Sequence, residues 1–251
     1  MSSLMTAGIL FGCVSLGTFL ALWLSRRLPE AHLTGDSRDV VKQGLGVIGT
    51  LTALVLGLLV ASTKGTYDAQ SGTIKEVAAQ FALMDRVLAR YGPETREARE
   101  ELRNLAQAVL DQFWPQSGPI QLTGGASRQI GEAFFDRVAA LEPKTEAQRL
   151  LKSRALETTV GLAQLRQRLV VNSDRTLPTS LLVLLAFWQT TLFAGFGLLA
   201  PRNATAMIVL CICMLASCSA LFVVLELDRP FEGMIRISDA PIRTVLSHLG
   251  E

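Results

Sequence analysis

The stretch "QGLGVIGTLTALVLGLLVAST" (Gln43 to Thr63) decides the fold of this chain, because none of its residues is charged. A bilayer core about 30 Å thick is crossed by about 20 apolar residues in an α-helix, and this stretch is long enough. Three further windows without charge cover 1–25, 176–201 and 203–225. The windows predict four transmembrane helices, at roughly 6–25, 44–63, 179–200 and 204–226.

The composition agrees with a membrane protein. Of the 251 residues, 49% are hydrophobic and only 18% are charged, whereas soluble domains carry about a quarter charged residues. The net charge of +2 is too small to indicate a nucleic-acid partner. Arg26 and Arg27 follow the first apolar window. A cleaved signal peptide carries positive charge before the apolar run, so we expect a true membrane span.

The windows divide the chain into four predicted parts. Spans one and two occupy 1–63, a helical domain 64–175, spans three and four 176–227, and a tail 228–251. Pro201 and Asn203 in "LAPRNAT" (Leu199 to Thr205) are turn residues, so spans three and four form a hairpin. The predicted fold class is all-α: a four-transmembrane-helix membrane protein with a helical domain between spans two and three.

Helical periodicity runs through the polar block. One apolar stripe continues span two out of the membrane as a long rod, until "YGP" (Tyr91 to Pro93) ends it; its residues are Ile74, Val77, Phe81, Met84, Leu88 and Tyr91. Further apolar faces lie in 102–113 and 130–141, and a helix is predicted over 146–171. The tail has an apolar face, which must dock on the helical domain or on a neighbouring subunit; its residues are Ile242, Val245, Leu246 and Leu249.

The distribution of positive charge predicts the topology. Eight Lys and Arg residues lie near the span ends on the side of the helical domain, and five lie on the other side. Positive charge near span ends favours the cytoplasm, so the helical domain is predicted to be cytoplasmic.

Small residues are patterned along span two. Gly49, Ala53, Gly57 and Ala61 recur at steps of four, with Gly46 and Thr50 beside them. Such a stripe allows close helix packing, and it can equally form a pore wall with room for water and ions. No span carries an internal charge, which disfavours a carboxylate-based pump. A passive pathway with an apolar gate agrees with this pattern.

The last span ends in "LELDRPFEG" (Leu225 to Gly233). Glu226 and Asp228 are oxygen ligands of the kind that Ca²⁺ prefers, although Ca²⁺ takes 6–8 oxygens. Alternatively, Arg229 pairs with one of these acids, and Pro230 simply ends the helix.

No feature predicts an enzyme. The four cysteines lie inside the predicted spans, where they can pack as small apolar residues. The histidines, His32 and His248, are far apart. We find no nucleophile–base set, phosphate loop or metal cluster, and no certain cofactor is expected.

Three phrases together resemble the bacterial bestrophin-like family: "GLLVASTKGTYDAQ" (Gly57 to Gln70), "FGLLAPRNAT" (Phe196 to Thr205) and "LELDRPFEGMIRIS" (Leu225 to Ser238). This family is distantly similar to the bestrophins, which are homopentameric anion channels. The resemblance implies a multi-pass protein of the bacterial inner membrane, in contact with lipid, which assembles with its own copies as a pentamer and passes ions.

The resemblance also implies roles for individual residues. In bestrophins the second span lines a narrow neck, and aligning the polar exit of span two places that neck near Gly46, Thr50 and Leu54. Because most of these positions are small here, the gate is expected at Leu54 and Leu58, with Gly57 also lining the pore. Gly49, Ala53 and Ala61 are expected to pack against other helices.

In the bestrophins an acidic cluster after span four, beside a Pro-Phe pair, forms a Ca²⁺ clasp. The resemblance thus makes Glu226 and Asp228 candidate Ca²⁺ ligands. We favour a structural hinge formed by Arg229, Pro230 and Phe231, in which Arg229 pairs with a carboxylate.

A second hypothesis comes from a different class. The chain could be a non-conducting membrane scaffold or sensor whose helical domain binds a protein partner. It would use the seam from Ile74 to Tyr91 and the charged helix faces, such as "ETREAREELR" (Glu94 to Arg103).

Overall fold

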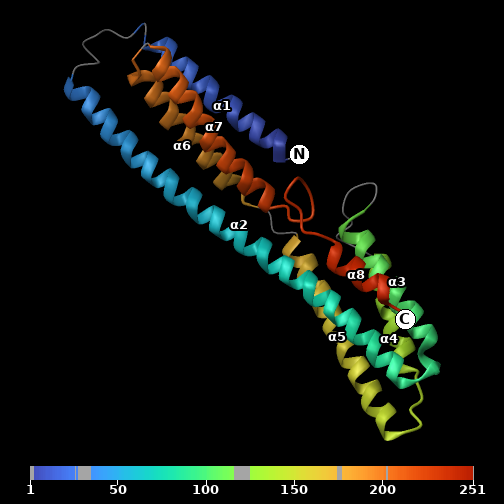
Figure 1. Ribbon diagram of the computed structural model, residues 1–251. Coiled ribbons are helices and arrows are strands. Elements are labelled where there is room, and N and C mark those ends of the chain that lie inside the picture. Colours follow the sequence, from blue (N-terminus) through green and yellow to red (C-terminus); the bar gives the residue numbers. More distant parts are fainter. Residues whose placement is uncertain are drawn as a thin grey trace. The chain divides into compact units, whose positions relative to one another are not determined.

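The computed structural model describes residues 3–25, 27, 35–115, 125–173, 177–201 and 203–250. Within these ranges the chain forms helices and no strand (Figure 1), which confirms the predicted all-α fold: α1 (Ser3–Leu24), α2 (Gly35–Tyr91), the short 3₁₀ helix η2 (Pro93–Thr95), α3 (Arg96–Phe113), α4 (Gly125–Ala139), α5 (Glu146–Ser173), α6 (Thr179–Leu199), α7 (Ala204–Leu227) and α8 (Ala240–His248).

The chain divides into two compact units, and α2 passes from one into the other. The membrane unit comprises Met1–Gly65 and Thr176–Ile235. The helical unit comprises Thr66–Arg175 and Arg236–Glu251.

Four helices are long and apolar enough to cross a membrane: α1, α2, α6 and α7. This confirms the four predicted spans. Many large apolar side chains on them face outward, among them Leu16 at 64% exposure and Phe187 at 64%. Helices that are apolar on all sides belong in lipid or in a protein core, so these exposed surfaces fit a bilayer.

Close packing joins the helices of the membrane unit. α1 packs against α6 and α7, and α6 packs against α7. Gly17 of α1 lies so close to α6 that a Cβ atom there would come within 2.5 Å of Thr190 Cγ2. A buried cluster of Leu59, Leu185 and Leu221 joins α2 to α6 and α7.

Helix α2 is longer than its membrane span. It begins at Gly35, earlier than the predicted start of the span at 44, because polar residues such as Asp39 and Lys42 extend it and pair at 3.0 Å. It ends at Tyr91, as "YGP" predicts. Gly92 adopts φ 138°, a value that favours glycine, and so breaks the helix.

The helical unit has its own apolar core. All six residues of the predicted stripe on α2 are buried: Ile74, Val77, Phe81, Met84, Leu88 and Tyr91. The predicted faces of α3 and α4 are buried at Leu102, Phe113 and Phe134. α8 packs against α3, with Ile242 fully buried. The tail therefore docks on the helical block of its own chain.

Candidate functional site

The predicted pore residues lie on one exposed face of α2. Gly46, Thr50, Leu54, Gly57 and Leu58 are all exposed in the single chain, and Leu54 and Leu58 keep 61% and 63% of their surface. At about 100° per residue these positions fall within an arc of about 120°. The opposite face carries the buried side chains, at Leu45, Thr52, Leu59 and Thr63.

The predicted packing residues of α2 divide between these two faces. Gly49 lies against α6, where a Cβ atom would be 3.6 Å from Leu192 Cδ1. Ala53 and Ala61 are exposed in the single chain and lie beside Gly57. The close approach of another helix to Ala53 and Ala61 therefore stays a prediction about a neighbouring copy.

The exposed face of α2 is neutral. No residue from 43 to 63 is charged. The hydroxyl of Thr50 donates to the carbonyl oxygen of Gly46 at 2.9 Å, within the same helix. The face therefore offers small and apolar surface, with no fixed charge that could bind an ion tightly or carry a proton.

Glu226 is buried at the end of α7 and holds the chain that follows. Its Oε2 atom accepts the backbone N–H groups of Met234 at 2.5 Å and of Ile235 at 3.2 Å. Gly233 has φ 78°, and a Cβ atom there would overlap the carboxylate. Only glycine fits this approach, so Glu226 and Gly233 together fix the loop after α7.

Asp228 has a different backbone partner. Its Oδ2 atom accepts the N–H of Leu177 at 3.1 Å, just before α6. Burial raises the pKa of Asp228 above its ordinary value, while the N–H of Leu177 and the charge of Arg229 oppose the rise. Asp228 therefore ties the end of α7 to the start of α6.

The predicted hinge residues form a turn. The N–H of Glu232 donates to the carbonyl oxygen of Arg229 at 3.0 Å, with Pro230 at the second position, where proline favours a β-turn. Pro230 and Phe231 are buried. The Arg229 guanidinium lies 3.9 Å from a carboxylate oxygen of Glu232, and its charge also acts on Asp228.

The Ca²⁺ prediction stays open. Among the described residues, no three or more His, Cys, Asp or Glu side chains are grouped so that they could hold a metal ion. The oxygen atoms of Glu226 and Asp228 accept backbone N–H groups instead. Both carboxylates therefore have a structural role, as acceptors of backbone hydrogen bonds, that needs no metal ion.

Two aromatic residues bind the backbone just before α8. The sequence did not predict this role for them. The indole N–H of Trp114 donates to the carbonyl oxygen of Ile237 at 2.9 Å, and the hydroxyl of Tyr67 to that of Arg236 at 3.5 Å. A buried Trp N–H usually finds an acceptor. That rule predicts a partner for Trp114, but the sequence holds no signal that identifies Ile237.

Other proteins, whose family is known, share this architecture of four apolar helices and a helical unit. The family model of the bestrophin-like domain matches residues 12–242. The chain belongs to the bestrophin-like family. This confirms the resemblance that the three phrases indicated.

Solved structures share the fold of the family. A variant of a bacterial bestrophin homologue from Klebsiella pneumoniae superposes with a TM-score of 0.73 at 15% identity, covering 99% of this chain and 97% of that chain. A further crystal structure of this homologue gives a TM-score of 0.69 at 12% identity, over 99% and 97% of the two chains. None of the curated proteins matches this chain.

Proposed function

We propose that the chain is a subunit of an oligomeric, bestrophin-like ion channel that passes anions along a pore lined by α2. The observation that carries the proposal is the exposed, uncharged face of α2 in a chain of this family. By family likeness the assembly is a homopentamer in the bacterial inner membrane, and the helical domain is cytoplasmic.

The chemistry of α2 supports a passive pore. Gly46, Thr50 and Gly57 leave space around an axis, while Leu54 and Leu58 project apolar side chains. A ring of apolar side chains can gate a pore by excluding water. Leu54 and Leu58 are therefore the proposed gate.

The end of α7 is the proposed hinge. The turn from Arg229 to Glu232 and the bonds of Glu226 and Asp228 fix where the chain leaves the last span. This anchoring supports a structural role for Arg229, Pro230 and Phe231, ahead of a Ca²⁺ site at Glu226 and Asp228.

Reconstitution of purified protein in planar bilayers tests the channel. We expect single-channel currents whose reversal potential follows the chloride gradient. Leu54→Ser should raise the open probability or the leak, because it makes the apolar ring wettable. Leu16→Ser changes a leucine of similar exposure on α1 and should leave the current unchanged.

Two results would contradict parts of this proposal. If the folded, oligomeric protein gives no current at any voltage, pH or Ca²⁺ concentration, the proposal that it is a channel is wrong. If the reversal potential follows the cation gradient, the proposed anion selectivity is wrong, while the proposed pore still stands.

The scaffold hypothesis loses one of the two surfaces on which it was based, while the charged helix faces such as Glu94 to Arg103 remain at the surface. The residues from Ile74 to Tyr91 that would form its seam are buried inside the helical unit of the same chain. A partner protein would therefore have to bind another face.

A further inference from the structure

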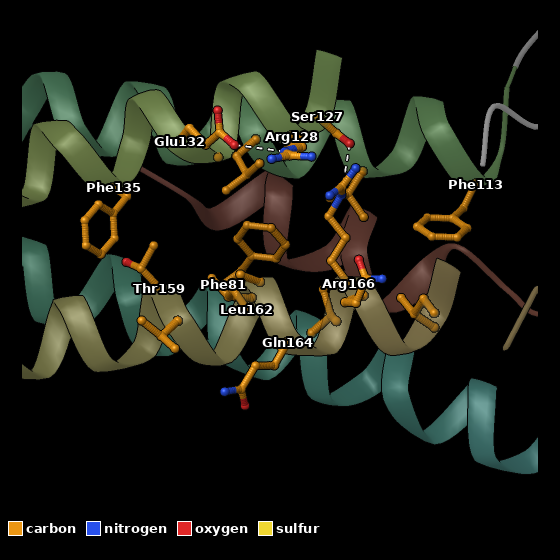
Figure 2. Close-up of a pocket in the computed structure, with 18 of the residues that line it drawn as sticks. Phe81, Phe113, Ser127, Arg128, Glu132, Phe135, Thr159, Leu162, Gln164 and Arg166 are labelled. Atoms are coloured by element: carbon orange, nitrogen blue, oxygen red, sulfur yellow. Dashed lines mark hydrogen bonds and ion pairs between the residues drawn. The ribbon is translucent and has the colours of Figure 1, made fainter. Parts of the chain in front are cut away.

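The helical unit contains a cavity that has no part in the proposed pore. It has a volume of about 560 Å³ and is lined by residues of α2, α3, α4 and α5 (Figure 2). Pockets for small molecules have volumes of roughly 300 to 1,000 Å³. All the lining residues belong to one compact unit, so the cavity is formed without a second copy.

The walls of the cavity are largely apolar. They include Phe81, Leu105, Phe113, Phe135 and Leu162. In Figure 2, Phe113 and Phe135 lie at opposite ends, with Phe81 between them. Protein interiors leave few voids larger than a water molecule, and apolar cavities hold water poorly. The cavity therefore suits an occupant with an apolar body.

The end of the cavity near Ser127 is polar and ordered by hydrogen bonds. Ser127 is only 3% exposed. Its hydroxyl donates to Gln112 Oε1 at 2.5 Å and accepts the Nε–H of Arg166 at 3.1 Å. Arg166 extends from α5 toward α4 in Figure 2. These bonds hold a guanidinium in a fixed orientation at the cavity wall.

The charge at this end favours an anion. Burial and then the positive charge of Arg128 lower the pKa of Arg166, so a bound anion would stabilise its charged form. Arg128 pairs with Glu132 at 2.9 Å, so these two lining residues offset each other's charge, and Arg166 supplies the positive charge at this end. Asp136 lies about two turns farther along α4, toward Phe135.

We propose that this cavity binds an amphipathic carboxylate of the fatty-acid type. Its head lies at the guanidinium of Arg166, which the hydrogen bond to Ser127 orients, and its apolar chain extends past Phe81 toward Phe135. The binding needs only the helical unit of the intact chain, so it does not depend on ion conduction.

Photolabelling of the full-length protein in detergent tests the site. The probe is decanoate with a diazirine on its chain, and the matched probe is the methyl ester of the same compound, which lacks the charge. We expect the carboxylate to label peptides of α3, α4 and α5 in preference to the ester. Excess unlabelled decanoate should compete with this labelling.

Variants of the protein test separately how it binds the carboxylate head and the apolar body of the ligand. Arg166→Gln should reduce carboxylate labelling about tenfold, to the level of the ester, because a charge-assisted hydrogen bond is lost. Gly131→Leu should abolish labelling by both probes, because Gly131 lines the cavity and its Cβ atom would meet Leu105 in ordinary contact at 3.8 Å. Gly161→Leu changes a helical glycine that is not among the residues lining the cavity. A Cβ atom there would meet no neighbouring atom of the described residues within 4 Å, so this variant should change nothing.

Three outcomes would overturn the proposal. The carboxylate and its ester could label these helices equally in the unchanged protein. Labelling could be confined to the apolar surface of α1, α6 and α7, which would indicate non-specific partitioning. The cavity could also become labelled only after dissociation of the oligomer, which would show that a second copy fills it.

Discussion

Glu226 and Asp228 show how two carboxylates close in sequence take separate roles. Residues two apart on a helix point in directions about 200° apart. Glu226 accordingly binds the N–H groups of Met234 and Ile235, and Asp228 binds that of Leu177. Their spacing alone suggested a shared ligand, but each side chain anchors a different piece of backbone.

The raised pKa of Asp228 predicts a pH dependence of stability. The folded chain holds this proton more tightly than the unfolded chain, whose ordinary value is 3.8. The contribution of Asp228 to the free energy of unfolding therefore falls as the pH rises from that value through the raised pKa. Asp228→Asn keeps an oxygen for Leu177 and should remove this slope.

Thermal unfolding in detergent across that pH range measures the effect. The stability of Asp228→Asn relative to the unchanged protein should rise with pH. Asp111→Asn removes an exposed charge and serves as the control. Parallel pH profiles for Asp228→Asn and the unchanged protein would contradict the prediction.

Gln189 is a buried amide inside α6 with an unusual environment. It is fully buried, and among the described residues neither its Nε2 nor its Oε1 atom has a hydrogen-bond partner. An unpaired buried polar group costs about 1–3 kcal/mol. Gln189→Leu should therefore stabilise the protein by about that amount, seen as a higher midpoint of thermal unfolding. A lower midpoint would show that the amide holds a water molecule or another ligand.

At the scale of elements, α1 and α6 come close together at Gly17 of α1. A Cβ atom at Gly17 would lie 2.5 Å from Thr190 Cγ2. The hydroxyl of Thr190 donates to the carbonyl oxygen of Ala186 at 2.7 Å, which holds its rotamer and prevents the methyl group from turning away. The two helices would have to separate.

Gly17→Ala should therefore destabilise the membrane unit by about 1–3 kcal/mol, although alanine favours helices. Gly12→Ala is the matched control in α1, since among the described residues no neighbouring atom outside its own helix backbone lies within 4 Å of its Cβ position. The midpoints of thermal unfolding of both variants in detergent, each compared with that of the unchanged protein, test this prediction. Equal midpoints would show that α1 adapts without loss.

The sequence predicted elements better than contacts. Uncharged windows and apolar stripes located the four spans and the long rod of α2, because length and periodicity are local properties. The start of α2 at Gly35 was missed, since charged residues such as Asp39 and Lys42 carry no hydropathy signal. The bonds of Glu226 and Trp114 were also beyond reach, because their backbone partners depend on how the chain folds back.

At the scale of the whole molecule, the two units should respond separately to damage. Ile242 of α8 is fully buried in the helical unit. Ile242→Ala should cost about 2–5 kcal/mol and should speed hydrogen exchange in α3 and α8. Exchange in α1 and α6 should stay unchanged, because opening occurs in cooperative units. Equal acceleration in all helices would instead indicate one unfolding unit.

The interleaved order of the two units has a consequence for synthesis. The helical unit takes its last part from Arg236–Glu251, after the chain has returned to the membrane unit for Thr176–Ile235. A ribosome adds about 5–20 residues per second. The surface of α3 that α8 covers in the folded protein therefore remains exposed for seconds, while the last two spans are synthesised and inserted. The newborn chain therefore presents a temporary apolar surface, which a chaperone could shield until the final residues emerge.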